Sequence, residues 1–189
     1  MKKTIIKTAA VLLVLTMLML GFATWRYPFS AFSLYHAVTF DQHNLLFTEY
    51  RKELQQFKNY YHNHKKQDDV TSDHVQYILQ AYQIPFLTND KAMKISIDTL
   101  DEIIAVLRKT RDDIVELAFT EKYDEETRNY LKLMLIDFLS LEEQAQHVKN
   151  ASGDSRKVLH LQIRNLRTSM QSNLGHLATF YKLYIETTS

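Results

Sequence analysis

The stretch YLKLMLIDFLSLEEQAQHV, from Tyr130 to Val148, carries apolar residues at alternating steps of three and four. Such steps place side chains on one stripe of an α-helix, because a helix turns once every 3.6 residues. The stripe consists of Leu131, Met134, Phe138, Leu141, Ala145 and Val148. The sequence therefore predicts a long helix from a cap at Asp124 to about Asn150, with this stripe in a hydrophobic core.

Apolar residues also lie outside that stripe, at Leu133, Ile136 and Leu139. A helix that is apolar on several sides is either enclosed by its own protein or packed against a second partner. We therefore predict that these three residues form a partner-binding surface.

The same spacing recurs along most of the chain after Phe40. It predicts further helices at about 40–66, 73–83, 90–120 and 154–186. The seam of the first of these helices reads His43, Phe47, Tyr50, Leu54, Phe57, Tyr61 and His64. Short turns at 120–123 and 150–153 join the later long helices, so we predict an all-α fold, an antiparallel four-helix bundle with one short extra helix. The pattern does not decide whether residues 67–89 preserve the alternating direction of the helices.

An apolar segment precedes the helical body. Residues 8–27, TAAVLLVLTMLMLGFATWRY, contain one charged side chain and are predicted to form a transmembrane anchor. Because Lys2, Lys3 and Lys7 lie before it, we expect residues 1–7 in the cytoplasm and the body outside, held at the cell membrane by a single span. Residues 28–39 then form an aromatic membrane-proximal segment and 40–189 an extracytoplasmic helical bundle. The alternative is a secreted protein cleaved near Ala23.

A second predicted partner surface lies near the end of the chain. Phe180, Tyr181 and Tyr184 would form an aromatic collar at the membrane-proximal end of the bundle, because amphipathic aromatic rings are stable at wet interfaces. Core packing is the alternative for these rings.

Composition excludes several function classes. The 189 residues include no Cys, which removes thiolate catalysis, iron–sulfur clusters and cysteine zinc sites. The formal net charge of +1 gives no reason to expect nucleic acid as a partner. Only 3 Gly and 2 Pro are present, and no phosphate loop, serine elbow or metal-binding helix motif occurs. We therefore expect no enzyme activity and no cofactor.

Alternating helix directions would gather a basic group at the end farthest from the membrane. Its members would be Lys65, Lys66, Arg156, Lys157 and His160. Such a group would suit a polyanion of the envelope, and three of its imidazoles, with those of His62, His64 and His147 included, would suit zinc. The alternative is that nearby aspartates neutralise the charge.

The sequence thus favours a binding role over a chemical one. We expect an adaptor, scaffold or modulator of the bacterial envelope whose partner is another envelope protein, with a homo-oligomer as a further possibility. The alternative function is an envelope ligand-binding module that uses the basic group for a polyanion or zinc.

Overall fold

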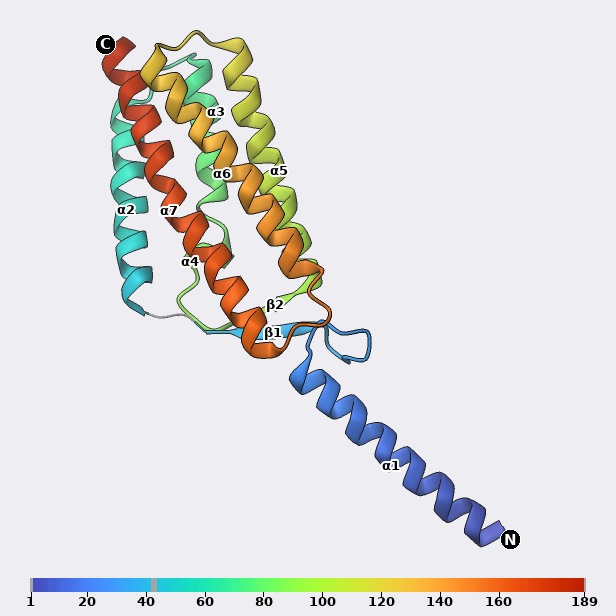
Figure 1. Ribbon diagram of the computed structural model, residues 1–189. Helices are drawn as coiled ribbons and strands as arrows, with labels where there is room; N and C mark the ends of the chain where they lie inside the picture. The colour runs from blue at the N-terminus through green and yellow to red at the C-terminus, as the bar shows by residue number, and fades with distance from the viewer. Residues whose placement is uncertain (1, 42–43, 189) are drawn as a thin grey trace.

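The computed structural model describes residues 2–41 and 44–188 and is mostly helical. In chain order its elements are α1 (Lys2–Arg26), β1 (Ala37–Phe40), α2 (Asn44–His64), α3 (Val70–Ala81), α4 (Pro85–Thr88), β2 (Met93–Ser96), α5 (Ile97–Thr120), α6 (Glu125–Lys149) and α7 (Arg156–Thr188). All but α1 form one body, and α1 projects from one end of it (Figure 1).

Helix α1 contains a segment, Lys7–Arg26, that is long and apolar enough to span a membrane, with a mean hydropathy of 2.0. Its side chains touch little of the protein: Leu12 is 60% exposed and Met19 is 71% exposed. An apolar surface of this extent is stable only when something other than water covers it.

The predicted seams account for most of the core. In α2, Phe47, Tyr50, Leu54, Phe57 and Tyr61 are buried, whereas His64 is exposed and His43 lies outside the described residues. The whole α6 stripe quoted above is buried. Burial of these stripes against one another is the main source of stability, at about 1.5–3 kcal/mol for each large apolar side chain.

The helices alternate in direction only in part. Lys149 Nζ lies 2.6 Å from Asp101 Oδ1 and Arg111 Nη1 lies 2.8 Å from Glu142 Oε1, so α5 and α6 run antiparallel. Helix α2 runs parallel to α7, because the Phe57 ring packs on Tyr181 and Lys66 reaches Thr188. The prediction that the long helices alternate throughout is therefore wrong for this pair.

The segment 67–89 is the reason. The hydroxyl of Tyr61 donates to the Ser72 carbonyl, and that of Tyr50 donates to the Tyr82 carbonyl, so α3 runs antiparallel to α2. Helices α3 and α4 thus carry the chain back to the end where α2 began (Figure 1). Helix α5 then starts at that end and runs in the same direction as α2.

The all-α prediction also needs correction, because a small sheet closes the end of the body next to α1. Strands β1 and β2 pair antiparallel, with Ala37 opposite Ser96 and Phe40 opposite Met93. Val38 and Ile95 are fully buried on this sheet. As a result, α2 and α5 begin later than the apolar spacing predicted, at Asn44 and Ile97.

Asp69 joins the start of α3 to the end of α7. Its Oδ2 atom accepts a hydrogen bond from the Ser72 backbone N–H at 2.7 Å, which caps α3, and its Oδ1 atom accepts one from the Tyr184 hydroxyl. Burial alone would raise the pKa of Asp69, but these hydrogen bonds and the nearby Lys66 outweigh burial and lower this pKa. The charged carboxylate therefore stabilises the folded protein.

We expect Asp69→Ala to lower the free energy of unfolding by about 1–3 kcal/mol at neutral pH, because the cap and a buried hydroxyl lose their acceptor. The unfolded chain has an Asp pKa of about 3.9, so the contribution is present above that pH and declines as the pH falls through the lower folded value. Urea unfolding followed by circular dichroism at several pH values measures it. Asp69→Asn keeps an acceptor and should lose less; equal losses would contradict the role of the cap.

Candidate functional site

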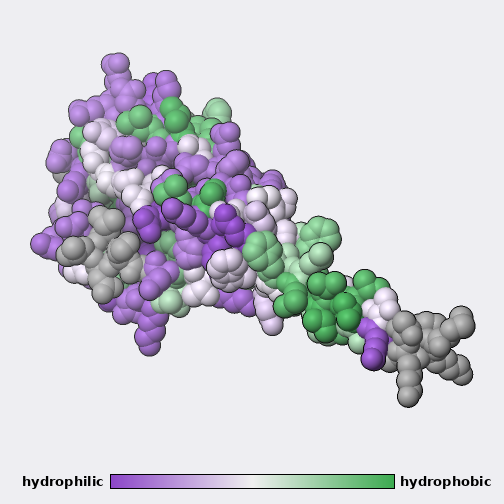
Figure 2. Space-filling view, turned by 60° about the horizontal axis from the view of Figure 1, so that its bottom comes forward, coloured by the Kyte–Doolittle hydropathy of each residue, from purple (hydrophilic) through white to green (hydrophobic). Residues whose placement is uncertain are grey.

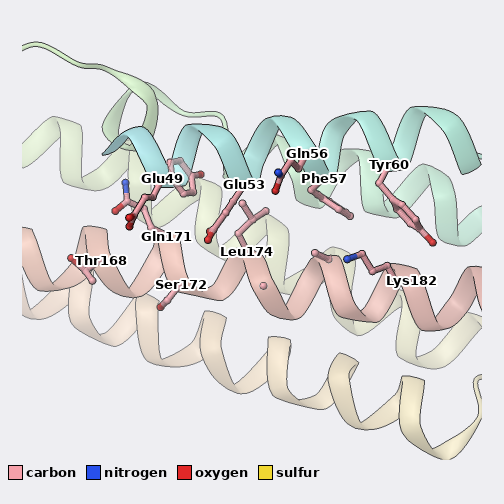
Figure 3. Close-up of a pocket in the computed structure, with 13 residues that line it drawn as sticks. Glu49, Glu53, Gln56, Phe57, Tyr60, Thr168, Gln171, Ser172, Leu174 and Lys182 are labelled. Carbon is pink, nitrogen blue, oxygen red and sulfur yellow. The ribbon is translucent and has the colours of Figure 1, made fainter. Parts of the chain in front are cut away.

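A groove separates α2 from α7 over much of their length. Its volume is about 660 Å³ and it is open to solvent along one side. The residues that line it are Glu49, Tyr50, Glu53, Gln56, Phe57 and Tyr60 from α2, and Thr168, Gln171, Ser172, Leu174, Gly175, Ala178 and Lys182 from α7. Figure 3 shows Glu53, Phe57 and Tyr60 extending from α2 toward α7, and Leu174 extending from α7 toward α2. The groove exists because α2 packs on α7 less extensively than α6 does.

The α7 side of the groove carries small residues, among them Gly175 and Ala178. Gly175 lies inside a 33-residue helix, and a Cβ atom placed on it would meet no described atom within 4 Å beyond its own stretch of helix. Glycine inside a helix lowers stability by about 0.5–1 kcal/mol relative to alanine. No contact with the described residues requires glycine here, and the position faces open space.

Polar groups divide the groove by charge. Glu49 and Glu53 lie toward the start of α2, on the side of α1, whereas Lys182 lies near the opposite end of α7 (Figure 3). Beside Glu49 the Nε2 atom of Gln171 is buried and has no hydrogen-bond partner among the described residues (Figure 3). A buried unpaired donor is unfavourable by about 1–3 kcal/mol, so an acceptor supplied by a bound partner would be stabilised there.

The predicted surface of Leu133, Ile136 and Leu139 is exposed on α6. Their exposed fractions are 42%, 51% and 49%. Exposure is necessary for docking but does not identify a partner. These residues line no part of the α2–α7 groove.

The predicted aromatic collar is wrong as a surface. Phe180 and Tyr181 are fully buried, and Tyr184 is 8% exposed. Tyr181 is enclosed because it packs against Tyr61 of α2 and its hydroxyl lies 3.1 Å from the Ser72 hydroxyl. The parallel course of α2 and α7 also places these rings at the end of the body away from α1 (Figure 1).

The predicted basic group is not assembled. Lys65 pairs with Asp73, and Lys66 donates to the Thr188 carbonyl at the end of α7. Arg156, Lys157 and His160 lie at the other end of the same helix, about 50 Å away at 1.5 Å per residue. The prediction failed because it assumed that α2 and α7 run in opposite directions.

Arg156 instead joins the body to α1. Its guanidinium donates to the carbonyls of Trp25 at 2.9 Å and Thr24 at 3.3 Å. The pKa of nearby His160 is lowered by burial and by the charges of Arg156 and Arg164, so this imidazole is held neutral at the junction.

The predicted aromatic segment lies beside this junction. Phe32, Leu34 and Tyr35 are 70%, 62% and 69% exposed. Hydrophobic surface continues from α1 onto the adjoining part of the body (Figure 2). The end of the body next to α1 therefore presents apolar side chains together with Arg26 and Lys94, which stack on Tyr27 and Tyr35.

The groove residues were missed from the sequence. A helix-interior glycine in a chain with 3 Gly was the available signal, but its meaning depends on which helix faces Gly175. Comparisons of the chain with known family models, with curated proteins and with solved structures find no match.

Proposed function

We propose that this protein is a membrane-anchored adaptor or modulator of the bacterial envelope, and that it binds a segment of another envelope protein in the α2–α7 groove. The observation that supports the proposal is the open groove between α2 and α7. Gly175 leaves its α7 side without a side chain, although no contact with the described residues requires glycine there. A partner backbone can approach a helix closely only where side chains are small.

The anchor is supported by the segment Lys7–Arg26 and by the lysines before it, which favour a cytoplasmic N-terminus. Helix α1 continues through Ala23, and the Leu34 backbone N–H donates to the Thr24 hydroxyl at 3.0 Å. The residues around the alternative cleavage site thus belong to the folded junction, which favours an uncleaved anchor. Phe32, Leu34 and Tyr35 would then lie at the lipid headgroups.

The groove also suggests what the partner segment contains. Thr168 and Lys182 lie about 21 Å apart along α7, enough for about four turns of helix or a shorter extended peptide. A basic side chain would be favoured near Glu49 and Glu53, and an acidic one near Lys182. The alternative function, a polyanion or zinc site built from the basic group, loses its support because that group is not assembled.

We expect Gly175→Ala to raise the free energy of unfolding by about 0.5–1 kcal/mol, because alanine is the better helix former and its Cβ meets no other atom. Denaturant unfolding followed by circular dichroism measures the change. Ala178→Gly on the same wall should lower the free energy by at least as much, because Ala178 also packs against the core. A loss of stability in Gly175→Ala would mean that the backbone at this position needs glycine for another reason.

Crosslinking in intact cells tests the function. A photoreactive amino acid in place of Ser172 should capture a partner protein, and the added Gly175→Trp substitution should abolish capture by filling the groove. The same photoreactive amino acid in place of Ile136 reports on the exposed α6 surface. Capture at Ile136 with none at Ser172 would reject the groove and favour α6; recovery of the protein alone from both positions would reject the adaptor function.

A further inference from the structure

We propose that His74, Asp113 and Glu116 bind a divalent transition-metal ion between α3 and α5. One ligand atom of each of the three side chains lies within 4.8 Å of those of the other two. This site is on a different face of the protein from the α2–α7 groove, and it does not depend on the function proposed for that groove.

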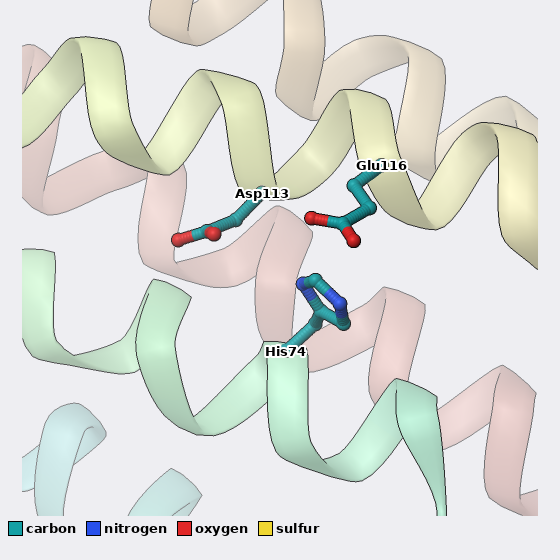
Figure 4. Close-up of side chains that lie close together, drawn as sticks. All are labelled: His74, Asp113 and Glu116. Atoms are coloured by element: carbon teal, nitrogen blue, oxygen red, sulfur yellow. The ribbon is translucent and has the colours of Figure 1, made fainter.

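Two neighbouring helices supply the ligands. Figure 4 shows the His74 ring extending from α3 toward α5, with the carboxylates of Asp113 and Glu116 on the facing side of α5. Residues three apart lie on the same face of a helix, so both carboxylates face α3 by their spacing alone. A metal ion held here would fasten α3 to α5.

The state of the His74 ring supports this inference. Its Nδ1 atom is shielded from solvent and makes no hydrogen bond to any described residue. A shielded imidazole nitrogen without a partner is unfavourable, and most such atoms in folded proteins have one. A metal ion would take a lone pair of the ring and remove this cost.

A cation would also stabilise the carboxylates of Asp113 and Glu116. Asp113, which is partly buried, and Glu116 lie one helical turn apart on α5. Two carboxylates and a neutral imidazole together carry the charge that balances one divalent cation.

The ligand set indicates the class of metal. Imidazole nitrogen is a good ligand for Zn²⁺ and neighbouring transition metals, whereas Mg²⁺ and Ca²⁺ prefer oxygen ligands throughout. Three protein ligands leave at least one coordination position for water, as in open zinc sites. Zn²⁺ should therefore bind, and Mg²⁺ at the same concentration should not compete.

Thermal unfolding of the full chain in detergent micelles, with ZnCl₂ or MgCl₂ added, tests the site. Ligand at a hundred times its Kd stabilises a protein enough to raise Tm by about 5–10 °C for a chain of this size. We expect that rise with Zn²⁺ and not with Mg²⁺. An equal rise with both ions, or no rise with Zn²⁺, would overturn the proposal.

Variants assign the effect to these residues. His74→Gln and Asp113→Asn should each weaken Zn²⁺ binding by at least about tenfold, since even groups that only support a ligand change metal affinity by about 10- to 100-fold. The double variant His62→Gln/His64→Gln, on α2, should bind as the unaltered protein does. Visible absorption of bound Co²⁺ gives a second readout that does not depend on stability. An unchanged Co²⁺ spectrum and Zn²⁺ titration in both single variants would place the metal elsewhere.

Discussion

Raising the pH from about 9 to about 12 unfolds the helical body, because at least four buried tyrosines must remain neutral while the protein is folded. The four are Tyr50, Tyr82, Tyr123 and Tyr184. Burial raises the pKa of each of them, and for Tyr184, which also donates to Asp69, it raises the pKa to about 12. An unfolded tyrosine has a pKa of about 10.

The direction of the effect follows from proton binding. Above about pH 10 the unfolded chain releases tyrosine protons that the folded chain retains, so the free energy of unfolding falls with rising pH. Each fully buried tyrosine contributes up to about 1.4 kcal/mol per pH unit. Tyr50 and Tyr82 are the most deeply buried of the four and lower the free energy of unfolding most, and Tyr123 and Tyr184, nearer the surface, lower it by a smaller amount.

Arg167 acts in the opposite direction. Burial lowers its pKa to about 10, and the charge of Tyr50 offsets part of that shift. Between that value and the unfolded pKa the unfolded chain binds more protons at this residue, so Arg167 alone would make stability rise with pH. One such group opposes four tyrosines and therefore moderates the loss without reversing it.

Tyr82→Phe is the variant that tests this account. The Tyr82 hydroxyl is buried and has no hydrogen-bond partner among the described residues, so its removal should leave stability at neutral pH unchanged or slightly higher. The midpoint of alkaline unfolding should move upward, measured by circular dichroism together with tyrosinate absorbance. Tyr35→Phe, at a side chain that is 69% exposed, is the control and should not move it. Exposed tyrosines such as Tyr35 ionise without unfolding, so only a tyrosinate absorbance that reaches its full value before any loss of helix would contradict the prediction.

The helices could be predicted from the sequence because their evidence is local. Leu131, Met134 and Phe138 repeat a period that only a helix satisfies, and all three are buried. The strands left no comparable signal. Residues 37–40 and 93–96 are four residues long each, and Val38 and Ile95 pair only because the chain between them returns to the same end of the body.

The direction of α2 relative to α7 could not be predicted, and the errors in the candidate sites follow from this. Residues 67–89 are long enough to form helix that returns the chain to the end where α2 begins. Their composition does not indicate whether they do so. Once they do, Lys66 and Arg156 separate, Tyr181 becomes core, and the groove beside Gly175 opens. The cluster of His74, Asp113 and Glu116 likewise requires α3 to pack on α5.

The second large effect concerns Arg167, which is 6% exposed and connects three helices. Its Nη2 atom donates to the Leu87 carbonyl of α4 at 2.8 Å, and its guanidinium lies 5.6 Å from the centre of the Phe47 ring of α2. The Nε atom is buried without a partner among the described residues. The charge is thus buried and only partly satisfied, while the side chain still fills space in the core.

We expect Arg167→Ala to lower the free energy of unfolding by about 2–4 kcal/mol, because it leaves a cavity and an unpaired buried carbonyl. Arg167→Met fills the cavity and removes the buried charge, so its change should be within about 1 kcal/mol of zero. Urea unfolding at neutral pH separates these outcomes. If Arg167→Met loses as much stability as Arg167→Ala, the hydrogen bond from Arg167 to the Leu87 carbonyl holds α4 in place. If the methionine variant is stable but loses partner capture at Ser172, the role of the guanidinium is to set the spacing of α2 and α7, because Phe47 and Thr168 lie at the same end of the groove.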